Sequence, residues 1–318
     1  MKFMEFYKKY GIYVILFLVL AIFSIFAKDF LSVDNLMNIL RQVSMFGIVV
    51  VGVTFVMIAG GMDLSVGGQM AVIGMIGGIL MAKVGMPILP TILICIVINT
   101  LFGAINGLIA VKLNIFPMIV TLGTMLILDG LAYVITGGYP IFGLPKSFAM
   151  LGQGYISIVP IPVIIFALVI ALSWFVLNKT YLGRYFYAMG GNKNAARLAG
   201  VNVDHMQIFV YALCGFFTSI AAIIMLSRTN SAQPNAGSSY PFDCMTAAVL
   251  GGISFAGGEG NIGGAVVGVL IIGILNNGLL LMGVDSNWQG VIKGLVLIVA
   301  VGIDCIQRKG KKVKAVEV

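Results

Sequence analysis

Long apolar segments recur along the whole chain, and short polar connections separate them. An α-helix needs roughly 17–25 residues to cross a bilayer, and the apolar segments have about this length. A transmembrane barrel would instead show alternating segments of ~10 residues, which are absent. The pattern therefore predicts an all-α membrane helix bundle of about ten spans, forming one domain over residues 1–318. The spans are expected near 11–27, 43–60, 64–82, 89–111, 118–136, 157–178, 207–227, 242–256, 262–282 and 289–306.

Two of these spans depart from a simple crossing. The third follows directly after Met62-Asp63, and the eighth is short; glycine pairs lie beside both of them. Unwound backbone favours glycine, so these elements are expected to be broken or re-entrant helices. The first apolar run is longer than that of a signal peptide and has no cleavage site after it, so we interpret it as a retained span.

A short internal repeat relates the two halves of the chain. Asn106-Gly-Leu108 at the end of the fourth span and Gly123 in the fifth recur as Asn277-Gly-Leu279 and Gly294. Five spans separate the copies, so the copies would cross the membrane in opposite directions. The fold is therefore expected to contain inverted repeats, as many transporters do.

Composition and charge support this picture. Hydrophobic residues make up 60% of the chain and charged residues 9%, against roughly 25% charged residues in soluble domains. The net charge of +8 does not indicate a nucleic-acid partner, because the basic residues lie in short connections and at both ends. The positive-inside rule predicts that both ends and the segment 179–206 are cytoplasmic. That side then holds 13 of the 19 basic residues: Lys2, Lys8, Lys9, Lys112, Lys179, Arg184, Lys193, Arg197, Arg308, Lys309, Lys311, Lys312 and Lys314.

The sequence contains no motif for nucleotide, metal or catalytic chemistry. It has no G-x-x-x-x-G-K-[ST] loop for phosphates, and its one histidine, His205, lies in the polar central segment. No nucleophile–base set is visible, so no catalytic residue, cofactor or metal is expected. The cysteines lie far apart and are interpreted as buried thiols: Cys95, Cys214, Cys244 and Cys305.

Ionisable residues inside spans are candidates for function, because a charge at the bilayer centre costs ~2.5–3.5 kcal/mol on insertion scales. Asp129 is either a polar contact near the outer end of its span or part of a solute pathway. Asp63 and Glu259 are expected to cap half-helices, and Asp304 and Lys293 to reach the span ends. Neutral polar residues suit either a pathway for a neutral solute or hydrogen bonds between helices: Asn99, Asn106, Thr121, Thr124, Asn276 and Asn277.

The central polar segment interrupts the apolar pattern. Asn192 or Asn194 can cap a short helix, and Gly200 suits the turn after it. Flanking glycines at positions 183, 190 and 191 would let this helix lie at an angle. It serves either for close docking into a partner's groove or as an ordinary helix at the membrane surface. Its docking surface is expected to consist of Ala195, Ala196, Leu198 and Ala199, with Arg197 beside them.

Several motifs, taken in order, resemble the permease subunits of bacterial ABC importers for simple sugars, of the ribose type. One departure is Met62, where the family is expected to have isoleucine or leucine before Asp-Leu-Ser. The motifs cover nearly the whole chain: Gly60–Gly67, Phe116–Gly123, Gly183-Arg184, Gly190–Asn192, Ala195–Val201, Ser231–Gly237, Ala247–Ser254, Gly257–Gly260 and Asn276–Gly278.

The resemblance implies that a monosaccharide such as ribose is imported across the bacterial inner membrane by alternating access. A separate ATPase subunit would hydrolyse ATP, an extracytoplasmic sugar-binding protein would deliver the solute, and a second permease copy, identical or related, would complete the pathway. The resemblance assigns coupling to the ATPase to residues of the central loop: Gly183, Arg184, Asn192, Ala195, Ala196, Arg197, Leu198, Ala199 and Gly200.

The residues alone leave other functions open. An ion-coupled secondary transporter would depend on Asp129, and a passive channel for small polar solutes would need no partner. A membrane-embedded enzyme would need a nucleophile–base set, which is not visible. Permeases for branched-chain amino acids and for autoinducers are close alternatives within the same class. Pentose, hexose, inositol and autoinducer transporters share these motifs, so the sequence does not name the solute.

Overall fold

The computed structural model describes the backbone of residues 2–316 and the side chains of residues 11–302, 304 and 305. The basic residues before position 11 and after position 305 lie outside the described side chains. Two short strands form an antiparallel hairpin, in which Tyr155 pairs with Pro160 and Ile156 with Val159. In chain order the elements are α1 (Lys2–Phe26), α2 (Val33–Ile58), α3 (Val66–Gly78), η1 (Ile79–Lys83), α4 (Ile88–Lys112), α5 (Pro117–Val134), α6 (Ala149–Gln153), β1 (Tyr155–Ile156), β2 (Val159–Pro160), α7 (Ile161–Lys179), α8 (Tyr181–Gly191), α9 (Lys193–Leu198), α10 (Val203–Thr229), α11 (Tyr240–Leu250), α12 (Ile262–Leu281) and α13 (Ser286–Val316).

The chain is an all-α membrane bundle, as the hydrophobic pattern predicts. Within the described residues, seven helices are long and apolar enough to cross a bilayer: α2, α3 with η1, α4, α5, α7, α10 and α12. Shorter apolar stretches run over Gly11–Phe26 of α1 and Ser286–Gly302 of α13. The helix α11 has only 11 residues.

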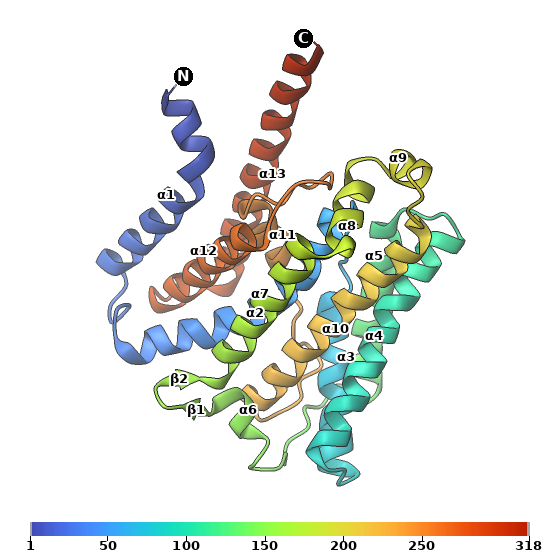
Figure 1. Cartoon of the computed structure of the whole chain (residues 1–318). Helices are drawn as coiled ribbons and strands as arrows, with labels where there is room; N and C mark the ends of the chain where they lie inside the picture. The colour runs from blue at the N-terminus through green and yellow to red at the C-terminus, as the bar shows by residue number, and fades with distance from the viewer. Residues whose placement is uncertain (1, 317–318) are drawn as a thin grey trace.

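The two ends of the chain lie at the same end of the bundle (Figure 1). The helices α8 and α9 also lie toward this end, at the upper right of the view, whereas α6 and the β1–β2 hairpin lie at the opposite end. The long helices connect these two ends. The molecule therefore has one end formed by α8, α9 and the termini and another formed by the hairpin.

Helices α2 and α10 form the centre of the bundle. From Val43 to Ile58 every residue of α2 is buried, and α10 packs on α2, α3 and α4. The backbones of helices α4 and α10 lie in close contact. A Cβ at Gly103 would lie 2.2 Å from the Tyr211 carbonyl oxygen, and one at Gly215 would lie 2.4 Å from that of Asn99. Small residues thus permit the close packing that drives helix association in lipid.

Several helix boundaries differ from the expected spans: α1 begins at Lys2, α10 begins at Val203, and α13 continues to Val316. Three further differences have a local reason. Helix α2 begins at Val33 rather than near 43, because Ser32 caps a polar first part that the apolar pattern does not reveal. Helix α7 begins at Ile161 rather than 157, after the hairpin and with proline in its first turn, a favoured place for proline. Helix α11 ends at Leu250 rather than 256, because Gly252 (φ +79°) turns the chain into a left-handed conformation.

Candidate functional site

The segment 179–206 folds into two helices, of which the sequence predicts only the second, α9. The first, α8, folds back tightly on α7: a Cβ at Gly183 would lie 2.0 Å from the Leu177 carbonyl oxygen. Phe186 of α8 is fully buried. Its ring meets Phe55 of α2 edge-on and stacks on Phe209 of α10, with centroids 5.9 and 6.4 Å apart. These contacts anchor α8 in the bundle.

Helix α9 begins and ends as the sequence predicts. The Oδ1 atom of Asn192 accepts the backbone N–H groups of Asn194 and Ala195, both at 3.0 Å. Gly200 follows the helix with φ +87°. The cap satisfies N–H groups that have no partner within the helix, and the glycine allows the left-handed turn that ends it.

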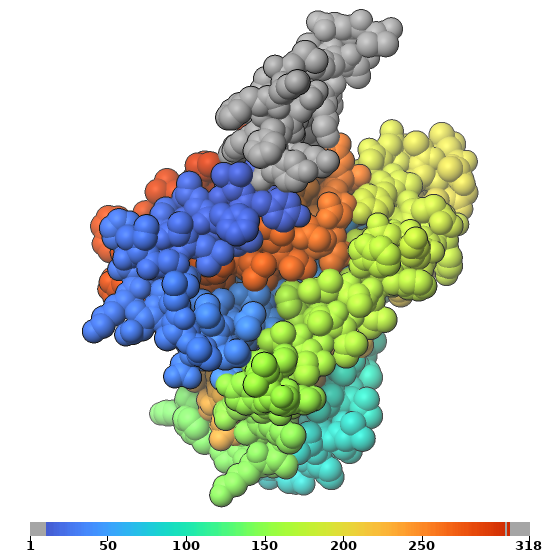
Figure 2. Space-filling view, turned by 60° about the vertical axis from the view of Figure 1, so that its left-hand side comes forward, coloured from blue at the N-terminus to red at the C-terminus, as the bar shows by residue number. Residues whose placement is uncertain are grey.

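The side chains of α9 differ sharply in exposure. Leu198 is 90% exposed, whereas Ala196 is 4% exposed. Ala196 therefore does not belong to the outer surface expected from the sequence, because one face of this short helix must pack on the bundle. The exposed surface, which we name the α9 surface, consists of Ala195, Arg197, Leu198 and Ala199, with Arg184 of α8 also exposed. In the space-filling view the yellow α8–α9 segment forms a knob at the upper right (Figure 2).

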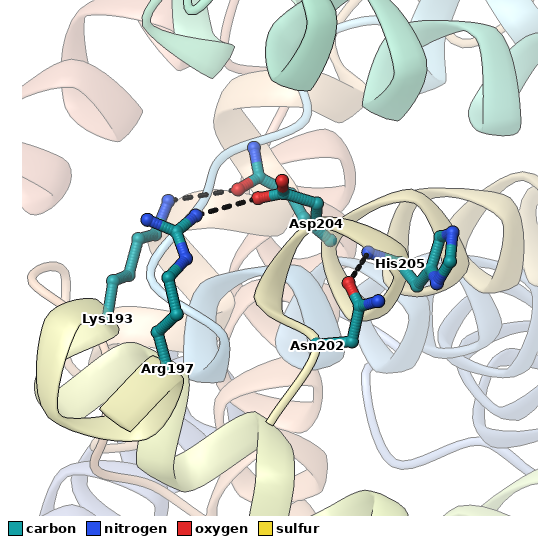
Figure 3. A network of polar contacts seen from close by, with 6 residues as sticks. Lys193, Arg197, Asn202, Asp204 and His205 are labelled. Carbon is teal, nitrogen blue, oxygen red and sulfur yellow. Dashed lines mark hydrogen bonds and ion pairs between the residues drawn. The ribbon is translucent and has the colours of Figure 1, made fainter. Parts of the chain in front are cut away.

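Polar contacts hold α9 to the start of α10 (Figure 3). The ammonium of Lys193 donates to Gln207 at 3.0 Å, and Arg197 forms an ion pair with Asp204 at 2.8 Å. An exposed ion pair of this kind contributes only ~0–1 kcal/mol. Burial lowers the pKa of Lys193, and the charge of Arg197 adds to this effect. A further hydrogen bond, from the His205 N–H to Asn202 Oδ1 at 3.1 Å, caps α10.

The C-terminal end of α8 contacts two segments of irregular backbone, one after α2 and one after α11. Glycines lie at these contacts. A Cβ at Gly190 would lie 1.9 Å from the carbonyl oxygen of Ile58, the last residue of α2, and 2.4 Å from the nitrogen of Gly258. The Gly258 N–H donates to that carbonyl at 2.9 Å. Gly60 and Gly257 complete this glycine junction with φ values of +76° and +87°. The helix α9 thus begins just after the point in the chain where α8 contacts the breaks that follow α2 and α11.

A buried polar network occupies the break between α2 and α3. The Oδ1 atom of Asp63 accepts the backbone N–H of Ser65 at 2.9 Å. The Ser65 hydroxyl accepts from Gln69 (2.7 Å) and from Asn106 (2.9 Å), and Asn106 accepts from Thr124 (2.6 Å). The sequence predicts that Asp63 caps a half-helix. In the structure Asp63 instead fixes the turn before α3. The network joins α3, α4 and α5.

Two more of the expected pathway residues bind main-chain carbonyls. Asn99 donates to the Gly215 carbonyl at 2.7 Å, and the Thr121 hydroxyl lies 3.4 Å from the Met62 carbonyl. Tyr211 also donates to the Met62 carbonyl, at 2.9 Å. These contacts hold α4 to α10, and hold α5 and α10 to the break before α3.

The remaining expected pathway residues lie in other parts of the bundle. Asn277 and Asn35 exchange two amide hydrogen bonds of 2.9 and 3.0 Å between α12 and α2. The neighbouring Asn276 and the carboxyl of Asp129 are half-buried, and Asp129 lies beside Gly68 of α3. The structure therefore brings Asn106, Thr121 and Thr124 together at the break before α3 and leaves the other expected pathway residues at separate places in the bundle.

Sequence reasoning missed an ion pair between α11 and α13. The ammonium of Lys293 lies 2.9 Å from Asp243 Oδ2, with the side chains 20% and 8% exposed. Lys293 was expected to reach the span end, but it binds this carboxylate instead. The signal was present, since Asp243 lies inside the eighth expected span and Lys293 inside the tenth. Two opposite charges in different spans indicate a pair, because isolated charges in lipid are costly.

Comparison with known proteins gives consistent matches over nearly the whole chain. The family model described as "Branched-chain amino acid transport system / permease component" matches residues 35–301. The chain is 43% identical to the ribose import permease protein RbsC of Haemophilus influenzae, covering 92% of this chain and 91% of the relative. It is 44% identical to RbsC of Bacillus subtilis, covering 93% and 92%. It is 38% identical to the galactose/methyl galactoside import permease protein MglC of Escherichia coli, covering 98% of each. No solved structure matches the chain. Taken together, the matches show that the chain belongs to this family of transport-system permease components.

Proposed function

We propose that this chain is the permease subunit of an ABC importer for a simple sugar, ribose or a similar monosaccharide. The observation that carries the proposal is the similarity to ribose import permeases over more than nine-tenths of the chain. The chain is the transport subunit and not an enzyme; a separate ATPase subunit hydrolyses ATP. Galactose permeases are also similar over the whole chain, at lower identity, so a hexose is the second candidate solute.

In this proposal the chain crosses the bacterial inner membrane ten times, in two inverted halves, with both ends cytoplasmic. The pattern of helix contacts supports two related halves: α4 packs on α10 as α12 packs on α2, and α3 packs on α5 as α11 packs on α13. The position of both ends on the side of α8 and α9 supports a shared cytoplasmic face (Figure 1). The basic residues of the central segment agree with this orientation.

The α9 surface docks on the ATPase and transmits its movement. The exposed Leu198 and the small residues beside it suit a groove in a partner, since small side chains permit close approach. The glycine junction supports the transmission step, because it joins the end of α8 to the breaks after α2 and α11. ATP-driven closure of the ATPase would thereby move the membrane helices and expose the pathway to one side and then the other.

An extracytoplasmic sugar-binding protein delivers the solute, and a second permease copy completes the pathway. The polar residues proposed to act during translocation lie on α4, α5 and α12: Asn99, Asn106, Thr121, Thr124, Asp129, Asn276 and Asn277. The hydrogen bonds of five of them join different elements of the bundle, and we propose that these bonds rearrange as the bundle switches between its two states: Asn99, Asn106, Thr121, Thr124 and Asn277. This rearrangement is typical of alternating access, in which one repeat moves against the other.

Reconstitution tests the proposal directly. Proteoliposomes are prepared with the permease, its genomic-neighbour ATPase and the neighbouring binding protein. The proposal predicts uptake of labelled ribose or galactose that needs ATP and the binding protein. Uptake that proceeds without ATP, or no sugar uptake by a complex that hydrolyses ATP, would refute it.

A further inference from the structure

A cavity of about 510 Å³ with several polar side chains in its lining lies between α11 and α13. This volume falls within the roughly 300–1,000 Å³ of small-molecule sites. Its lining includes the Asp243–Lys293 ion pair. Helix contacts in membranes are normally closed by small or apolar residues, so an ion pair that only joined two helices would need no open space beside it.

The polar residues around this cavity follow helical spacing on both elements. On the α11 side the lining consists of Ser239, Phe242, Asp243 and Thr246. On α13 it includes Ser286, Gln289, Lys293 and Leu297. Within each set, the later residues follow the first at helical spacings of three, four, seven or eleven residues. This spacing places the members of a set along one side of a helix. Two largely polar stripes therefore face each other across the cavity.

The stripe on α13 runs inward from the outer end of the helix. Lys293 lies seven residues beyond Ser286, or about 10 Å along the axis at 1.5 Å per residue. The stripe ends at the apolar Leu297. A polar surface at this depth is unfavourable against hydrocarbon, so it faces either an aqueous pathway or a partner. With α8 and α9 on the cytoplasmic side, as proposed above, Ser286 is at the outer end of α13, so the cavity lies beside the outer half of this helix.

The chemistry of the lining selects a class of solute. The charges of Asp243 and Lys293 cancel, so the cavity has no net attraction for an ion. The pair still offers both acceptor and donor atoms, as do the Gln289 amide and the hydroxyls of Ser239 and Thr246. The side chain of Gln289 is fixed by donating to the Val284 carbonyl at 2.9 Å. Phe242, 51% exposed, adds an apolar ring face.

We propose that this cavity is the outward-facing contact site for a neutral monosaccharide, with Asp243, Lys293 and Gln289 binding its hydroxyl groups. This inference rests on the proposed function and adds the place where the permease meets its solute. The Phe242 ring packs against the C–H face of the sugar. A zwitterionic amino acid would have to break the ion pair to meet its two charges, whereas sugar hydroxyls can bind to the intact pair.

Protection of a single cysteine tests the site. Gln289→Cys and the control Asn287→Cys are made in a Cys305→Ser background, because Cys305 is exposed whereas Cys95, Cys214 and Cys244 are buried. Asn287 is exposed at the start of the same helix but does not line the cavity. A membrane-impermeant maleimide is added from outside. Excess ribose or galactose should slow labelling of Gln289→Cys about tenfold, while leucine should not, and labelling of Asn287→Cys should be unaffected by any of these solutes.

Uptake provides a second measurement in case labelling alters the site. Gln289→Leu should lower binding-protein-dependent sugar uptake about tenfold, which corresponds to ~1.4 kcal/mol, whereas Asn287→Leu should match the wild type. The site is overturned if Gln289→Cys is not labelled from outside, if sugar does not slow its labelling, if leucine protects instead of sugar, or if Gln289→Leu imports normally. The control is the wild-type protein, which must import sugar for these outcomes to test the site. If the wild type does not import sugar, the result contradicts the proposed function instead.

Discussion

At the scale of single residues, the exposed fraction of each α9 side chain distinguishes the proposed docking surface from the residues that pack on the bundle. Leu198 is 90% exposed and Ala196 is 4% exposed, although they are two residues apart on α9. A six-residue helix held by a cap at Asn192 and by the Arg197–Asp204 pair has one free side and one packed side. The role of each α9 residue therefore depends on which side it occupies.

Substitutions on the two sides of α9 should have opposite consequences. Leu198→Asp should leave the stability of the permease within ~0.5 kcal/mol of the wild type, because it removes no internal contact. It should weaken co-purification with the ATPase. Ala196→Arg should destabilise the α9 fold by about 1–3 kcal/mol, because a long side chain enters a packed position. Thermal stability in detergent, measured beside ATPase co-purification, distinguishes the two effects; equal stability of both variants would contradict this assignment.

The glycine junction offers a matched pair of substitutions. A Cβ at Gly190 would lie 1.9 Å from the Ile58 carbonyl, whereas one at Gly191 would meet no atom within 4 Å. Gly190→Ala should therefore push α8 away from the breaks after α2 and α11 and lower coupled transport at least tenfold. Gly191→Ala should transport at nearly the wild-type rate. The measurement is sugar uptake per ATP hydrolysed, and equal ratios for the two variants would show that the junction does not transmit movement.

At the scale of elements, hydrogen bonds between helices explain why the polar span residues are buried. Asn35 of α2 and Asn277 of α12 satisfy each other's amides. An amide left without its partner in a buried position costs about 1–3 kcal/mol. The pair therefore fixes the position of α12 against the central helix.

A double-mutant cycle measures this contact. Asn277→Leu should destabilise the bundle by about 1–3 kcal/mol, because the buried Asn35 keeps its bond to the Phe30 carbonyl but its Oδ1 atom loses the donor at Asn277. Asn35→Leu with Asn277→Leu should recover part of the loss, since neither amide then remains. The readout is the apparent Tm of the purified permease. Additive losses in the double variant would indicate that the two residues act independently.

The sequence predicts the elements better than their contacts. The apolar runs indicate most of the long helices, and Asn192 and Gly200 predict both ends of α9. The helix α8 is missed because Gly183 and Arg184 interrupt its apolar residues and Gly190-Gly191 follows them, so no long apolar run forms. The Asp243–Lys293 pair is missed because 50 residues separate its members, and only the packing of α11 on α13 brings them together.

At the scale of the whole molecule, the bundle connects two functional ends. The cavity lies between α11 and the first part of α13, which is the outer part of that helix in the proposed orientation, and the α9 surface lies at the end that also carries the chain termini (Figure 1). The central helices α2 and α10 join these ends, and each is followed by a break in regular structure. Interrupted helices let a membrane protein move one part against another while its long helices stay intact. In the proposed mechanism, solute binding and ATPase docking are coupled through these breaks rather than through direct contact.

The most direct test of the account is to map which end of the permease contacts the ATPase. A benzophenone probe is attached to Leu198→Cys or to Ile158→Cys in the Cys305→Ser background. Ile158 is 76% exposed and lies in the hairpin at the far end of the bundle. The account predicts that irradiation of the assembled complex crosslinks the ATPase to the probe at Leu198 and not to the probe at Ile158. Crosslinking from Ile158, or none from Leu198 in a complex that contains the ATPase, would contradict it.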